Sequence, residues 1–198
     1  MKLHYSHNSP YARRVRLAVR VAGLEVEEVD ASPLMRDNHP LLQKGPGGKV
    51  PALETDAGTF ICETLVITGH LNHLAPGKLM PVDPSAMEAA LELEGIGSLL
   101  LDSLFACSHE KRRDANEQSP GLIAKETERS ARCYDVLDAR LAGKAAELNL
   151  GTIAVIAALG YADWRHAEND WRRGHESLSK WFDAMMQIPD VAATHPKF

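Results

Sequence analysis

Residues 1–30, MKLHYSHNSPYARRVRLAVRVAGLEVEEVD, decide the fold of the first half of this chain. The runs MKLHYS and EVEEVD each predict a short strand. Between them, residues 10–22 carry apolar side chains at spacings of three and four, which predicts a helix. Arg13, Arg16 and Arg20 fall on another face of that helix, which we expect to be mainly solvated. The chain therefore opens with a strand, a helix and a second strand.

The remainder of the chain divides at a proline-rich segment. After a less regular stretch, KVPALET, the turn DAG and TFICE predict two short strands, and TLVITGHLNHL returns to helical spacing. APGKLMPVDP holds three prolines and is expected to link two domains, residues 1–76 and residues 84–198. In the second domain, helices are predicted near residues 84–112, 120–142, 152–166 and 175–187.

Composition argues against several classes of function. The 198 residues carry a net charge of -5, which gives no electrostatic reason to expect nucleic acid or an anionic membrane as a partner. No apolar run reaches the ~20 residues that span a bilayer, and the first residues lack the apolar run of a signal peptide, so the cytoplasm is expected. Cys62, Cys107 and Cys133 lack Cys-x-x-Cys spacing and are expected to be free thiols, with Cys62 buried in its strand.

Ser9 and Pro10 form the first local feature that could carry chemistry. Serine is a preferred N-cap and proline is favoured at the first helical position, so the start of a helix is sufficient to explain this pair. The functional alternative is that the hydroxyl and the positive end of the helix face a ligand anion.

Val50 and Pro51, in GGKVPAL, form the second feature. A trans proline at the start of a strand is the ordinary interpretation, because only ~5% of X-Pro bonds in folded proteins are cis. A cis bond would instead turn the backbone groups of Val50 toward a cleft.

Glu63 and Thr64, in CETL, form the third feature, between a strand and a helix. Thr64 alone is explained as an N-cap and Glu63 as a solvated charge. Together they offer a carboxylate for an amino group and a helix N-terminus for a carboxylate, which suits an amino-acid head group.

Taken in order, these three features resemble the thioredoxin-like half of the glutathione S-transferases. LGTIAVIAALGYADWR resembles the core helix of that family, and the helical second half matches its companion domain. The resemblance covers essentially the whole chain. It implies an α/β thioredoxin-like N-terminal domain followed by an all-α C-terminal domain, and it is less specific for activity because this fold serves several functions.

The resemblance also implies a glutathione site. Ser9 would lie beside the sulfur as a hydrogen-bond donor, and Val50, before a cis Pro51, would pair by its backbone with the cysteinyl part. Glu63 and Thr64 would hold the γ-glutamyl end.

Four further residues are candidates in the same comparison. Lys49, and less directly Gln43 or His39, would approach the glycine carboxylate. Tyr5 is an alternative hydroxyl donor, although its place inside the first strand favours a structural role.

The implied activity is conjugation of the glutathione thiolate to a small hydrophobic electrophile, a detoxification reaction. Tyr11, Leu100, Leu104 and Phe105 are expected to line the electrophile pocket, although these residues can equally be packed core. Family resemblance implies a homodimer in which the helix after Thr64 and the helix near 84–112 meet their counterparts.

Two alternatives to a transferase remain open. One is a glutathione-dependent isomerase, lyase or dehalogenase on the same fold, and the other is a noncatalytic member that mediates protein interactions. His70 and His73 are three residues apart on a predicted helix, but no acidic or cysteine partner follows at a recognisable spacing, so no metal is expected.

The sequence departs from the family pattern at two places. The loop before Val50 is GPGG, which is richer in glycine than usual. In the core helix, Thr152 is expected as the N-cap, and Val155 stands where a capping box would have an acid. On that assignment, Val155→Asp should raise the thermal stability.

Overall fold

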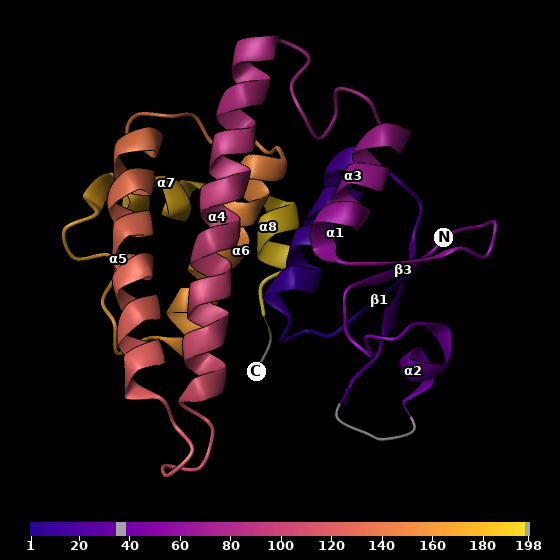
Figure 1. The fold of residues 1–198 in the computed structure, drawn as a ribbon. Coiled ribbons are helices and arrows are strands. Elements are labelled where there is room, and N and C mark those ends of the chain that lie inside the picture. The colour runs from indigo at the N-terminus through magenta and orange to yellow at the C-terminus, as the bar shows by residue number, and fades with distance from the viewer. Residues whose placement is uncertain (35–38, 197–198) are drawn as a thin grey trace.

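The computed structural model describes residues 1–34 and 39–196 and shows a small sheet domain beside a larger helical one (Figure 1). The first domain runs β1 (Lys2–Tyr5), α1 (Pro10–Ala22), β2 (Glu27–Asp30), α2 (Pro40–Lys44), β3 (Ala52–Glu54), β4 (Phe60–Cys62) and α3 (Thr64–Leu74). Its sheet has the strand order β2-β1-β3-β4, with β2 parallel to β1 and the other neighbouring pairs antiparallel. The predicted thioredoxin-like fold of this half is confirmed.

The two faces of the sheet have different coverings, because successive side chains of a strand point to opposite faces. Leu3 and Leu53 are fully buried in the main core, which also holds residues of α1 and α3. On the other face, His4 Nε2 lies 3.3 Å from Glu54 Oε2, and Lys44 of α2 donates to the same oxygen at 2.5 Å. These polar contacts attach α2 to the sheet.

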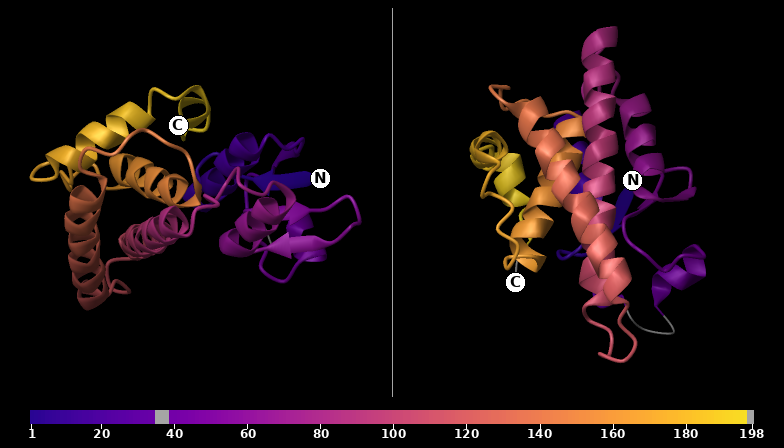
Figure 2. Two further views of the ribbon diagram at one scale, coloured as in Figure 1. Left: turned by 90° about the horizontal axis from the view of Figure 1, so that it is seen from above. Right: turned by 60° about the vertical axis from the view of Figure 1, so that its left-hand side comes forward.

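The second domain consists of helices, as predicted: α4 (Pro84–Glu110), α5 (Pro120–Leu141), α6 (Leu150–Arg165), α7 (Glu176–Met185) and the short α8 (Pro189–Ala193). Every residue from Leu150 to Ala162 of α6 is buried, because α6 packs against both α4 and α1. Figure 2 shows the helical domain from above and in side view, with α4 beside the first domain. Within the described part of the chain, no helix is both long and apolar enough to cross a membrane.

The N-terminus of α6 corrects the predicted cap. Asn149, not Thr152, is the N-cap: its side chain accepts a hydrogen bond from the backbone N–H of Thr152, whose hydroxyl in turn accepts one from the N–H of Asn149. A reciprocal capping box is therefore present, three residues upstream of the expected position. Val155 lies in the second turn and is fully buried, so the expectation that Val155→Asp stabilises the protein is wrong.

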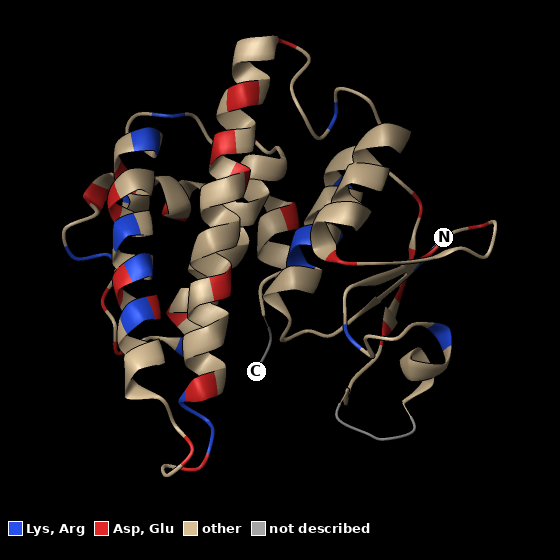
Figure 3. Ribbon diagram, viewed as in Figure 1, with Lys and Arg blue, Asp and Glu red and all other residues tan. Residues whose placement is uncertain are grey.

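The expectation that the arginines of α1 are mainly solvated is also wrong for most of them. Arg13, Arg14 and Arg16 are buried, and only Arg20 is exposed. Figure 3 shows basic residues of α1 on the side that faces the helical domain. Arg13 Nη1 donates to the Ile156 carbonyl and its Nη2 to the Val191 carbonyl, and burial lowers the pKa of Arg13 to about 10.

Two other arginine contacts show why the charges of α1 tolerate burial. Arg14 donates to Glu94 at 3.1 Å and to the Ser98 hydroxyl at 2.9 Å, both on α4. Arg16 donates to Glu28 on β2. Partners on α4, α6 and α8 therefore place Arg13 and Arg14 in the interface between the domains, whereas Arg16 is buried against β2 of the first domain.

The cysteines agree with the sequence in part. All three thiols are free, as expected. Cys107 and Cys133 are buried, whereas Cys62, expected inside its strand, is exposed at the end of β4. β4 is an edge strand of the sheet, which explains why one of its side chains stays in solvent.

Candidate functional site

The strand register brings three separate segments to one end of the sheet. His4 pairs with Ala52, and Ala52 pairs with Cys62. β1 therefore ends, β3 begins and β4 ends at the same end of the sheet. The loop that carries Ser9 follows β1, the Val50–Pro51 bond precedes β3, and Glu63 and Thr64 follow β4. Three features that are up to 55 residues apart in the chain, as counted from Ser9 to Thr64, thus share one end of the sheet.

Ser9 is the N-cap of α1. Its backbone is extended, with φ -86° and ψ 114°, and its Oγ accepts a hydrogen bond from the N–H of Ala12 at 3.1 Å. A hydroxyl oxygen has two lone pairs and one proton, so this bond uses a lone pair and leaves the proton free. Ser9 is half-buried, and the proton has no acceptor in the described part of the chain. Capping and donation to a ligand are therefore compatible for the same oxygen.

The Val50–Pro51 peptide bond is cis, as the resemblance implied. Val50 and Pro51 are both buried, and Val50 packs with Leu41 of α2 in a small satellite core. The side chain of Lys49, one residue earlier, is exposed. The burial of Val50 and Pro51 thus fixes the backbone before β3, while the flexible ammonium group of Lys49 lies beside it in solvent.

Glu63 and Thr64 begin α3 with an unusual backbone. Glu63 has φ 72°, a left-handed conformation that is uncommon for residues other than glycine, and its carboxylate is exposed. Its side chain makes no capping hydrogen bond, and Thr64 is buried. The first N–H groups of α3 therefore lack a side-chain cap and are available to an anionic ligand.

Two helix N-termini lie at this end of the sheet, because α1 and α3 both begin there. Each carries a partial positive charge, which favours an anion near its first turn. Lys44 of α2 is not among the residues expected at the site, and its partner Glu54 lies at the other end of β3, paired with Lys2. The ion pair of Lys44 with Glu54 holds α2, and with it the loop that leads to Lys49, against the sheet. Hydrogen bonds from Lys44 and His4 lower the pKa of Glu54.

The structure gives two other expected candidates structural roles. The Tyr5 hydroxyl lies 3.2 Å from His7 Nε2, its side chain is buried, and the Arg16 guanidinium stacks over its ring at 4.4 Å. His39 is buried and caps α2: its Nδ1 accepts from the N–H of Leu41, so its Nε2 donates to the Ala31 carbonyl. Both ring nitrogens of His39 are used, so it cannot also bind a carboxylate. Gln43 is exposed on α2.

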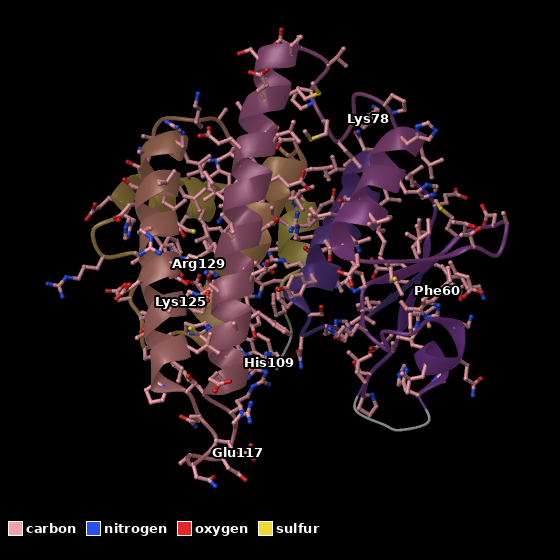
Figure 4. The ribbon with its side chains drawn as sticks, in the orientation of Figure 1. Phe60, Lys78, His109, Glu117, Lys125 and Arg129 are labelled. Carbon is pink, nitrogen blue, oxygen red and sulfur yellow. The ribbon has the colours of Figure 1, made fainter. Side chains whose placement is uncertain are left out.

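Residues of α1 and α4 form the side of the site nearest the helical domain. The Tyr11 hydroxyl donates to Asp102 at 2.6 Å, and its ring meets the edge of Phe105 with centroids 5.2 Å apart. Phe105 in turn packs against His109, at the lower end of α4 in Figure 4. Burial, followed by the hydrogen bond to Asp102, raises the pKa of Tyr11, so the phenol stays protonated throughout the ordinary pH range.

Leu100 and Leu104 do not join this aromatic pair. Leu100 has no exposed surface and Leu104 is 3% exposed, and both belong to the main core. The expected apolar wall is therefore corrected: Tyr11 and Phe105 stay at the domain boundary, while the two leucines are packing residues. In the described residues, no group of three His, Cys, Asp or Glu side chains has the geometry to hold a metal ion.

Comparisons with known proteins agree with this arrangement. Residues 3–79 match the family described as the N-terminal domain of glutathione S-transferase. The uncharacterized GST-like protein YibF of Escherichia coli K12 is 28% identical over 99% of this chain and 98% of its own.

Two solved structures are similar over nearly their whole length. The glutathione S-transferase from Methylobacillus flagellatus KT, with glutathione bound, has a TM-score of 0.91 at 29% identity and covers 99% of each chain. A glutathione transferase family member from Pseudomonas fluorescens Pf-5, also with glutathione, has a TM-score of 0.88 at 29% identity over 100% of this chain and 99% of the other. With the sheet, the helix starts and the helical second domain arranged as described, residues 3–79 of this chain form a glutathione S-transferase N-terminal domain, and the whole chain has the glutathione S-transferase fold.

Proposed function

We propose that the protein binds glutathione at the end of the sheet where Ser9, Val50–Pro51 and Glu63–Thr64 lie, and transfers it to a small hydrophobic electrophile. The convergence of these three segments is the observation that carries the proposal. Relatives of similar length bind glutathione, which supports the ligand. In the reaction the thiol loses its proton to solvent, the thiolate sulfur forms a bond to an electrophilic carbon, and a leaving group departs with its electron pair.

Each part of glutathione has a chemically matched partner at this end of the sheet. Glu63 would accept the γ-glutamyl ammonium, and the uncapped N-terminus of α3 at Thr64 would bind the neighbouring carboxylate. The backbone of Val50 would pair with the cysteinyl residue. Lys49 would approach the glycine carboxylate as a flexible cation.

Ser9 would stabilise the thiolate as a donor and not act as a nucleophile. A free thiol has a pKa near ~8.5 and is mostly protonated at neutral pH. A hydrogen bond to a charged group contributes about 1.5 to 3 kcal/mol, whereas a helix N-terminus contributes about 0.3 to 1 kcal/mol. The hydroxyl of Ser9 is therefore expected to contribute more than the dipole of α1.

The electrophile would lie between α1 and α4. Tyr11 and Phe105 offer aromatic surface there, and the Tyr11 hydroxyl is already committed to Asp102. The phenol is therefore not free to donate to the sulfur, so its proposed role is to contact the second substrate. We keep the predicted cytoplasmic location as part of this proposal.

We also propose a homodimer through α3 and α4, as the sequence analysis expected. Leu65 and Val66 of α3 are 55% and 58% exposed. On α4, Leu91 and Leu99 are 50% and 52% exposed, eight residues apart on one face. Exposed aliphatic side chains on two successive helices suit a second copy of the chain, because a two-fold axis pairs such a face with itself. Sedimentation equilibrium of the wild type and Leu91→Glu would test this, with a monomeric wild type contradicting it.

Isothermal titration with glutathione tests the central proposal. We expect one saturable site, together with conjugation of chlorodinitrobenzene followed by absorbance. Binding without conjugation would favour the isomerase, lyase or dehalogenase alternative. Absence of detectable binding would leave only the noncatalytic interaction protein and would refute the proposal.

A further inference from the structure

A cavity lies within the helical domain, away from the proposed glutathione site. Its volume is about 220 Å³, and it opens between α4, α5 and the connection from α6 to α7. Leu104 and Cys107 of α4, Tyr134 of α5, and His166 and Trp171 of the connection are among the residues that line it. For comparison, an apolar cavity of ~150 Å³ is large enough to bind benzene. The space therefore suits one small ring compound.

Helix α4 separates this cavity from the surface near Ser9. Its residues Glu94, Asp102 and Phe105 contact α1, at helical spacings that place them on one face. Leu104 and Cys107 lie on the face turned toward α5, where the Cys107 thiol donates to the Ile123 carbonyl. None of the residues assigned above to glutathione lines the cavity. A ligand there would occupy a different place from either substrate.

The aromatic wall of the cavity is held in a fixed position. The rings of Tyr134 and Trp171 stack with centroids 5.7 Å apart and an angle of 18° between their planes. Trp171 Nε1 donates to Asp163 at 2.6 Å, and the Arg172 guanidinium lies 4.6 Å from the centre of the indole ring. A rigid aromatic surface of this kind costs little conformational entropy when a flat ligand packs against it.

Among the buried side chains of the lining, Tyr134 and His166 each have a polar atom with no partner in the described part of the chain. Tyr134 is 7% exposed, and its hydroxyl makes no hydrogen bond there. His166 is 2% exposed; its Nε2 donates to the Leu104 carbonyl at 2.9 Å, which leaves Nδ1 as an unused acceptor.

Neither of these atoms is sealed inside the protein. Five other side-chain polar atoms of the described residues are buried without partners, and the Tyr134 hydroxyl and His166 Nδ1 are not among them. The small exposed surface of each residue therefore includes its unused polar atom, and both residues line the cavity. Burial lowers the pKa of His166, which keeps its ring neutral and Nδ1 able to accept near pH 7.

We propose that this cavity binds a small aromatic molecule that carries a hydroxyl group, independently of glutathione. The ring would pack beside Tyr134 and Trp171. The ligand hydroxyl would donate to His166 Nδ1 and accept from the Tyr134 hydroxyl, so that both unused polar atoms gain a partner. An apolar space with few polar groups in fixed positions is the usual form of a ligand site.

Isothermal titration of the full-length protein with phenol tests the proposal, with toluene as a ring of the same shape without the hydroxyl. We expect one saturable site for phenol, weaker binding of toluene, and the same phenol affinity with and without saturating glutathione. Tyr134→Phe removes one neutral hydrogen bond, worth about a 2- to 10-fold loss of phenol affinity. Tyr161→Phe, a second buried tyrosine that does not line the cavity, is the control and should bind phenol as the wild type does.

A second pair of variants keeps the test informative if Tyr134→Phe does not fold. Ala131 lines the cavity and Ala139 does not, yet both are exposed on α5. Ala131→Leu should fill the cavity and abolish phenol binding, while Ala139→Leu should leave it unchanged. Three results would each overturn the proposal: no saturable phenol binding, displacement of phenol by glutathione, or equal phenol affinity in the two leucine variants.

Discussion

Replacing Ser9 separates its two roles, because alanine and glycine differ as helix caps. Ser9→Ala removes both the oxygen that accepts from Ala12 and the free hydroxyl proton. Ser9→Gly removes the same hydroxyl, but glycine at an N-cap costs only a few tenths of a kcal/mol. Both variants therefore remove the proposed hydrogen bond to the thiolate, but Ser9→Ala should destabilise the start of α1 more than Ser9→Gly does.

The expected magnitudes follow from the geometry. Loss of the cap in Ser9→Ala should lower the free energy of unfolding by about 1 kcal/mol, and by less in Ser9→Gly. Loss of a hydrogen bond to the thiolate is worth about 1.5 to 3 kcal/mol, which corresponds to a fall in turnover of roughly 10- to 150-fold in both variants. The affinity for glutathione should change little, because its other contacts remain.

Urea unfolding measures the first effect, and conjugation of chlorodinitrobenzene at saturating glutathione measures the second. The thiolate absorbance of the bound glutathione near pH 7 gives a third readout, which should fall equally in both variants. If turnover follows stability, so that Ser9→Gly stays close to the wild type, Ser9 is only a cap. Unchanged turnover in both variants would remove Ser9 from the mechanism.

Three further predictions concern stability. Val155→Asp places a carboxylate in the core and should lower the free energy of unfolding by on the order of 3 to 5 kcal/mol, measured as a lower melting temperature; an increase would contradict its burial. Gly160→Ala brings a methyl group into contact with Arg13 Nη1 and should cost about 1 to 3 kcal/mol in urea unfolding, whereas a neutral effect would show that Arg13 can move aside. Burial lowers the pKa of His166, so the unfolded chain binds its proton first, and the folded protein should lose stability as the pH falls below about 6.5. His166→Gln should lose less stability between pH 7.5 and 5.5, and an identical pH dependence would refute this.

Much of the fold followed from local patterns. The turn and capping residues around Ser9, Pro10 and Gly23 determine where α1 begins and ends, because their backbone preferences act over only a few residues. The prolines at the starts of α4 and α5 act in the same way, so those helices begin at the predicted residues. The predicted N-cap of α6 was wrong because Asn149 and Thr152 both suit a cap, and local sequence does not say which one is used.

The candidate site was foreseeable only as a set of parts. Ser9, Val50–Pro51 and Glu63–Thr64 were each explained by ordinary helix and strand chemistry, and their order in the chain pointed to one ligand. The Tyr11–Asp102 bond and the corrected places of Leu100 and Leu104 depend on how α4 is rotated against α1. That rotation is set by contacts across the two domains, which no local pattern reports.

The elements of this protein, their approximate limits and the residue types available to a thiol ligand depend on near neighbours in the chain, so local sequence was enough to predict them. Which of those residues keep a free polar atom depends on contacts between distant segments. Arg13 and Arg16 look like a solvated stripe in sequence, yet partners on α6, α8 and β2 bury them. Tyr134 and His166 looked unremarkable, yet packing leaves each with an unused polar atom beside a cavity. Burial and hydrogen-bond partners arise between distant segments, so they are properties of the folded chain alone.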